Sequence, residues 1–108
     1  MMNNVLLIHV PSRREMSEGD IPFPLGLMYV GGILERMGKI VKILDLYLYD
    51  FPYEDRWGNL TLKKIIEDFS PDVIGFGGIA MSYGWAKNLS IQVRKNYPCI
   101  IQMAGGAL

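Results

Sequence analysis

The chain has 108 residues, half of them hydrophobic, and its 11 basic and 11 acidic residues give a formal net charge of zero. This length suits one domain, and the apolar fraction is sufficient for a packed core. The balanced charge argues against nucleic-acid binding, and the single cysteine excludes a disulfide framework or a cysteine-rich metal site within these residues. The apolar runs are too short to span a membrane and no signal-peptide pattern is present, so we expect a cytoplasmic protein.

Short apolar runs alternate with helical periodicities along the chain. The runs have the length and the Val and Ile content of strands buried on both faces: Val5–Val10, Ile40–Leu44, Val73–Phe76 and Cys99–Met103. Between them, apolar residues recur at helical spacing in three groups: Leu27, Val30, Leu34 and Met37; Leu62, Ile65, Ile66 and Phe69; Ala86, Leu89, Val93 and Tyr97. The expected helix stops are Gly38, Pro71 and Pro98. This alternation predicts an α/β domain with a parallel sheet covered on both faces.

Two long connections, Pro11–Pro24 and Tyr47–Asn59, and an early end mark the organisation of the chain. The polar segment Pro11–Asp20 is expected to be poorly ordered without a ligand, because it has little apolar surface to hold it. The sequence stops at Leu108, soon after the fourth predicted strand, whereas a doubly wound domain normally continues with a helix and a fifth strand. We therefore interpret residues 1–108 as one domain that is incomplete at its C-terminus.

Ligands of open α/β sheets bind beyond the carboxyl ends of the strands, and glycine pairs lie there in this sequence. Gly77-Gly78 and Gly105-Gly106 either admit a ligand to the backbone or allow a tight turn or close helix packing. The sequence contains no G-x-G-x-x-G and no G-x-x-x-x-G-K-[ST] motif, which disfavours a flavin or other nucleotide site. Ser82 precedes the third predicted helix and is expected to be its N-cap.

Other candidate residues receive mainly structural interpretations. His9 is the only histidine and is expected to pair with a neighbouring backbone group, because no partner residues accompany it in the sequence. Asp45 is expected to cap the loop that follows it, and Cys99 to be a small buried residue. An aromatic group in the second long loop is either a lid or partner surface, or a cluster that packs the loop: Tyr47, Tyr49, Phe51, Tyr53 and Trp57. We assign no catalytic residue and no metal ligand.

Several segments, taken in order, resemble a known family. They are Val5-Leu6-Leu7-Ile8 with Pro22-Phe23-Pro24-Leu25-Gly26-Leu27-Met28-Tyr29, then Gly38–Asp45, Ser70–Phe76 and Ala104-Gly105-Gly106. This pattern resembles the N-terminal cobalamin (B12)-binding domain of B12-dependent radical SAM proteins and covers almost the whole chain. The resemblance implies a flavodoxin-like Rossmann fold, a three-layer sandwich with a parallel sheet in the order 2-1-3-4, from which the fifth strand is missing here.

The resemblance also implies a cobalamin site at the strand ends. The positions that carry over as cofactor-binding are Pro11, Ser12, Gly77, Gly78, Ile79, Ala80, Met81, Ser82, Tyr83, Gly105 and Gly106. The DxHxxG motif of methionine-synthase-type B12 domains is absent, so His9 is not assigned as an axial ligand. Full-length relatives use a second, barrel domain, which is missing here and holds a [4Fe–4S] cluster and S-adenosylmethionine. They perform radical methyl transfer or ring-forming reactions, so this chain alone is not expected to be catalytic.

Two functions of different classes therefore stay open. The first is a cobalamin-binding module that works with the radical SAM barrel of a methyltransferase or cyclase. The alternative is a non-catalytic flavodoxin-like interaction or assembly domain without a cofactor. In either case, the open edge of the fourth strand predicts association of the chain with itself as a homo-oligomer.

Overall fold

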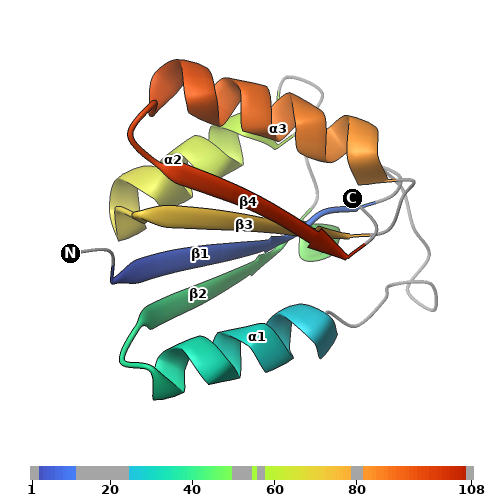
Figure 1. The fold of residues 1–108 in the computed structure, drawn as a ribbon. Coiled ribbons are helices and arrows are strands. Elements are labelled where there is room, and N and C mark those ends of the chain that lie inside the picture. The colour runs from blue at the N-terminus through green and yellow to red at the C-terminus, as the bar shows by residue number, and fades with distance from the viewer. Residues whose placement is uncertain (1–2, 12–24, 50–54, 56–57, 79–81, 107–108) are drawn as a thin grey trace.

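The computed structural model describes residues 3–11, 25–49, 55, 58–78 and 82–106. Strands and helices alternate in this part of the chain: β1 (Asn4–His9), α1 (Leu25–Arg36), β2 (Ile40–Asp45), the 3-10 helix η2 (Leu46–Leu48), α2 (Asn59–Phe69), β3 (Val73–Gly78), α3 (Tyr83–Asn96) and β4 (Ile101–Gly106). The strands form a parallel sheet in the order β2-β1-β3-β4 (Figure 1). The predicted α/β class, the strand order and the consistency with a flavodoxin-like fold are confirmed. The segment predicted to be poorly ordered lies, apart from Pro11, outside the described residues.

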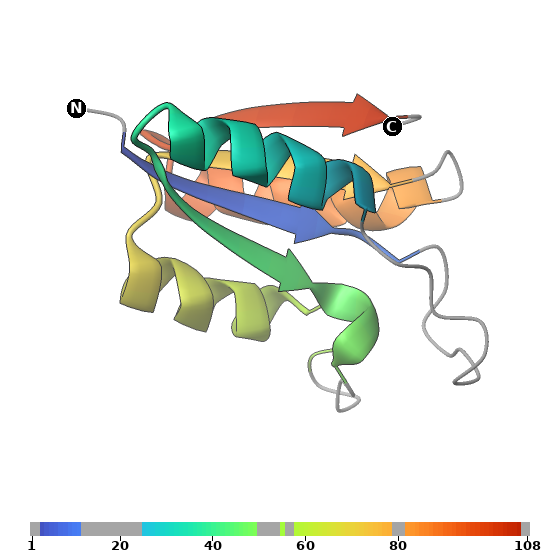
Figure 2. The same ribbon diagram turned by 90° about the horizontal axis from the view of Figure 1, so that it is seen from below.

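The helices lie on both faces of the sheet, α1 on one and α2 with α3 on the other (Figures 1 and 2). The main core fills the space between the sheet and the α2–α3 layer. It contains Leu6, Ile8, Val10, Leu44, Leu46, Leu62, Ile66, Ile74, Phe76, Trp85, Ala86, Leu89 and Val93. The even-numbered residues of β1 belong to it because successive side chains of a strand point to opposite faces. The apolar faces predicted for α2 and α3 are confirmed by this packing.

The apolar face predicted for α1 is partly wrong. Val30 and Met37 are 45% and 67% exposed, whereas Gly31 is buried between Leu27 and Leu34, which are half-buried. A Cβ atom at Gly31 would lie 3.4 Å from Val41 of β2, so the missing side chain lets this part of α1 approach the sheet closely. The buried face is therefore centred on a glycine, which a hydrophobicity pattern does not mark.

The end of α1 follows the prediction made for Gly38. Its φ is +86°, and its N–H donates to the carbonyl of Glu35 at 3.0 Å. The N–H of Lys39 donates to the carbonyl of Leu34, also at 3.0 Å. These two bonds are those of a Schellman motif, in which a left-handed glycine satisfies the last carbonyls of the helix.

The edge strands differ from the prediction that every strand is buried on both faces. Ile40 of β2 and Met103 of β4 are 58% and 62% exposed, because each strand has a neighbour on only one side among the described residues. β4 begins at Ile101, so Cys99 lies in the turn before it and is exposed, and its predicted burial is wrong. That turn is closed by the Ile100 N–H, which donates to the carbonyl of Tyr97 at 3.1 Å.

Within the described residues, no helix is both long and apolar enough to cross a membrane.

Candidate functional site

The carboxyl ends of three strands meet in register at one edge of the sheet. Gly77 pairs with His9 of β1 and with Gly105 of β4, and Gly78 pairs with Gly106. The sequence placed Gly77 and Gly78 directly after the third strand, whereas they are its last two residues. The parallel topology thus brings the two predicted glycine pairs side by side, at the edge where open α/β sheets bind ligands.

Gly77 and Gly78 are explained by packing within the chain. A Cβ atom at Gly77 would lie 2.8 Å from Cδ2 of Leu27 in α1, and one at Gly78 would lie 3.0 Å from the Ser82 side chain. Both distances are shorter than ordinary van der Waals contact, so a side chain at either position would displace a neighbour. For these two residues the close-packing interpretation is confirmed, and their conformation alone does not indicate a ligand.

Gly105 has a different environment. A Cβ atom built on it would have no heavy atom within 4 Å, so no packing within the described chain explains why this position lacks a side chain. The residue is exposed and pairs with Gly77 across the sheet. The end of β4 therefore presents bare backbone to the space beyond the strands, which allows a ligand to lie against it.

Ser82 fixes the start of α3 to the end of β1. The side chain is fully buried, and its hydroxyl donates to the carbonyl of Val10 at 3.0 Å. Ser82 occupies the N-cap position of α3, but its side chain makes no capping hydrogen bond, so the predicted capping role is wrong. The hydroxyl instead satisfies the carbonyl of the buried residue Val10, just beyond the end of β1, and a buried carbonyl is costly to leave unpaired. Pro11 is also fully buried, and Tyr83, the first residue of α3, is 57% exposed.

His9 and Asp45 form a pair at the ends of β1 and β2. The His9 Nδ1 atom lies 3.1 Å from Asp45 Oδ1, and the two side chains are only 12% and 11% exposed. The same Oδ1 accepts from the backbone N–H of Tyr47 at 3.1 Å, which confirms that Asp45 caps the turn after its strand. The Tyr47 ring packs against the imidazole with 4.8 Å between ring centroids. The partner of Nδ1 is thus a side chain and not the predicted backbone group, because the register places Asp45 directly opposite His9.

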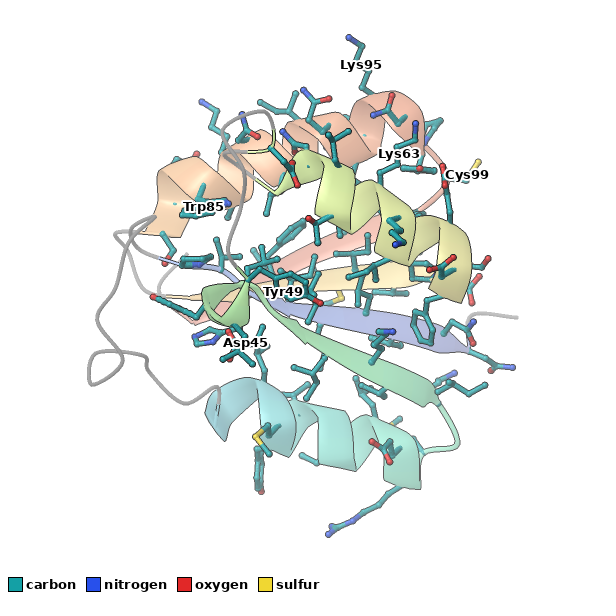
Figure 3. The ribbon with its side chains drawn as sticks, turned by 180° about the vertical axis from the view of Figure 1, so that it is seen from behind. Asp45, Tyr49, Lys63, Trp85, Lys95 and Cys99 are labelled. Atoms are coloured by element: carbon teal, nitrogen blue, oxygen red, sulfur yellow. The ribbon has the colours of Figure 1, made fainter. Side chains whose placement is uncertain are left out.

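A carboxylate behind an imidazole holds the ring in one orientation and directs the other ring nitrogen away from it. Figure 3 shows Asp45 beside η2 at this edge of the sheet, and Tyr49 follows the same 3-10 helix. The pair was missed as a feature because its members are 36 positions apart in the sequence. The predicted strand order contained the signal, since it makes the strands that end in these two residues neighbours. The described residues contain no group of three potential metal ligands.

The described site thus combines Pro11, Gly77, Gly78, Ser82, Tyr83, Gly105 and the backbone of Gly106 with His9, Asp45 and Tyr47. Ser12, Ile79, Ala80 and Met81, which were also predicted to bind the cofactor, lie outside the described residues, as do Phe51, Tyr53 and Trp57 of the aromatic group. In this arrangement, side-chain contacts hold the strand ends together, and the backbone at Gly105 stays open. The Ser82 hydroxyl in this site is already bonded to the Val10 carbonyl.

Comparison with protein-family models found no match, and comparison with solved structures found no significant match. A search of curated proteins found cytidylyl-2-hydroxyethylphosphonate methyltransferase of Streptomyces wedmorensis, which is 34% identical over 74 residues. The similarity covers 56% of this chain, but the chain spans only 14% of that protein. Part of this sequence is therefore similar to part of a methyltransferase.

Proposed function

We propose that this chain is the cobalamin-binding module of a B12-dependent radical SAM methyltransferase. Two sequence similarities support this proposal. The sequence motifs resemble the cobalamin-binding domain of that family, for which methyl transfer is one of the expected reaction types. The partial relative is itself named as a methyltransferase. The fold adds the parallel strand order that the resemblance implies.

The observation that carries the proposal is the open backbone at Gly105. Cobalamin is a large, flat ligand, and such a ligand needs a strand end from which no side chain projects. At the ends of β3 and β4, Leu27 and Ser82 occupy the space that a Cβ atom on Gly77 or Gly78 would need. A Cβ atom on Gly105, in contrast, would have no heavy atom within 4 Å. When bound, the cofactor would supply a cobalt atom that carries the methyl group.

The other residues of the chain would hold the cofactor without reacting. Pro11, Ser12, the segment 77–83, Gly105 and Gly106 would line its site. The Ser82 to Val10 hydrogen bond keeps the exit of β1 and the start of α3 at a fixed separation. The His9–Asp45 pair ties the end of β2 to the end of β1. We assign the imidazole to this bracing role and propose no bond from it to cobalt.

The test is retention of hydroxocobalamin. The protein is incubated with the cofactor and desalted, and the absorption spectrum is recorded; we expect the cobalamin bands to stay with the protein. Gly105→Val fills the open position, so it should abolish retention while leaving the melting temperature unchanged, because a Cβ there meets no atom within 4 Å.

Gly32→Val in α1 is the matched control, because Gly32 is also exposed and a Cβ atom there also has no neighbour within 4 Å. This variant should keep both cofactor and stability. Loss of the bands from the wild-type protein, or full retention by Gly105→Val, contradicts the proposal. The first of these results favours the alternative of an interaction domain without a cofactor.

A further inference from the structure

A groove of about 610 Å³ lies between α3 and β4, on the face of the sheet opposite α1. Its wall is formed by residues spaced along almost the whole of α3, from Tyr83 to Lys95. Its floor is formed by Phe76 of β3 and by Gln102 and Ala104 of β4. The groove therefore runs along α3 for about three turns. On its other side it is bounded by the edge strand β4.

The charges that line the groove have one sign. Lys87, Arg94 and Lys95 line it, and no acidic residue does so among the described residues. All three cations are exposed, and none makes an ion pair in the part of the chain that the structure describes. Figure 3 shows Lys95 extending away from the molecule near the C-terminal end of α3. Cations aligned along a groove favour an acidic occupant.

The groove also has apolar walls and a polar atom that lacks a partner. Ile91 lines it and is 53% exposed, and Phe76 and Ala104 add apolar surface from the sheet. Met103 also borders the groove, but its side chain points to the α1 face, because it alternates with Gln102 and Ala104. Gln102 donates from Nε2 to the Ser90 carbonyl at 3.2 Å, whereas its Oε1 atom is buried without a hydrogen-bond partner among the described residues. This Oε1 atom has almost no accessible surface, so the contact with an occupant depends on the apolar and charged side chains of the groove.

We infer that this groove binds an amphipathic α-helix of a partner protein, with an apolar face against Ile91 and Ala104 and acidic residues toward Lys87, Arg94 and Lys95. A helix fits because helices pack side by side at 8–10 Å and α3 already supplies one wall of matching length. Lys87 and Arg94 are seven residues apart, so the partner's acidic residues should also lie about two turns apart.

A second copy of this chain is a poorer occupant of the groove. In an isologous contact the same surface faces itself, so the three cations of one copy would meet the same three cations of the other. Like charges brought together in this way oppose association. The inference is independent of the proposed cobalamin function, since the groove lies on one face of the sheet and the open backbone of Gly105 belongs to the edge formed by the strand ends.

The test uses three fluorescein-labelled peptides of about 18 residues, long enough for five helical turns. They share one apolar face and carry Glu, Gln or Lys at the positions meant to meet the cations. Fluorescence anisotropy should show the Glu peptide binding at least about tenfold more tightly than the Gln peptide, with the Lys peptide weaker still. Binding of the Glu peptide should weaken as salt is added.

Variants of the protein locate the binding surface. Arg94→Glu combined with Lys95→Glu should lower the affinity for the Glu peptide at least about tenfold and invert the preference toward the Lys peptide. Lys63→Glu is the control, because Lys63 is an exposed lysine of α2 outside the groove (Figure 3). Equal binding of the three peptides, no binding of any, or a dimer in light scattering that the double variant abolishes would overturn the inference.

Discussion

Replacing Ser82 by alanine tests how the two halves of the candidate site are held together. The variant removes the hydroxyl that donates to the Val10 carbonyl at 3.0 Å in a fully buried position. A buried acceptor that loses its partner costs about 1–3 kcal/mol. At about 2.1 cal/mol/K of unfolding entropy per residue, 108 residues give a shift of about 4 °C per kcal/mol. We therefore expect Ser82→Ala to lower the melting temperature by about 4–13 °C.

The assay is thermal unfolding followed by circular dichroism, with two further variants. Ser90→Ala is the control: Ser90 lies in the middle of α3 and offers its backbone carbonyl rather than its hydroxyl to Gln102, so its melting temperature should not fall. Ser82→Asp separates the two roles of the serine, because a carboxylate is a good N-cap but a costly group to bury. We expect Ser82→Asp to be more destabilised than Ser82→Ala. An aspartate variant as stable as the wild type would refute the reasoning.

Two further predictions concern the ends of α2. Asp55 is 5% exposed and accepts from two backbone N–H groups of the first turn of α2 and from the Thr61 hydroxyl at 2.8 Å. Asp55→Ala should therefore lower the free energy of unfolding in urea by about 2–3 kcal/mol, whereas Thr61→Val should cost about 1 kcal/mol; equal losses would contradict this. Ser70 ends the helix at a φ of +51°, so Ser70→Gly should raise the same quantity by about 1 kcal/mol, and a loss of stability would show that the strain is absent.

The elements that the sequence predicted correctly are those whose burial follows a regular period. Leu62 and Ile66 repeat on one face of α2, and both are buried in the core. Helix α1 did not follow its pattern, since its closest approach to the sheet is at Gly31 and its aliphatic residues are largely exposed. Hydrophobicity records which residues avoid water, but it contains no information on where two backbones come close. The predicted burial of Cys99 was wrong because the apolar run from which it was inferred includes the turn before β4 as well as the strand.

The candidate site was predicted less completely than the fold. The sequence placed Gly77, Gly78, Ser82 and Gly105 at the carboxyl edge of the sheet, where they lie. It could not show that the first three make close contacts within the chain. Asp55 was not singled out, because a capping residue outside the first turn of its helix has no sequence signature. Such roles depend on contacts between residues far apart in the sequence. The strand order limits which residues can meet, but it does not determine which of them form contacts.

The composition of β4 bears on what covers it. An edge strand that faces water is usually protected by charged residues, proline or a bulge. The six residues of β4 contain no charge and no proline, and Ile101 and Met103 are 42% and 62% exposed. This is the composition of an interior strand, so a further segment is expected to lie beside it. Self-association through this strand stays a prediction. The cations along α3 oppose an isologous arrangement that seats the groove of one copy against that of another, whereas an acidic helix in that groove would shield one face of β4 without placing like charges together.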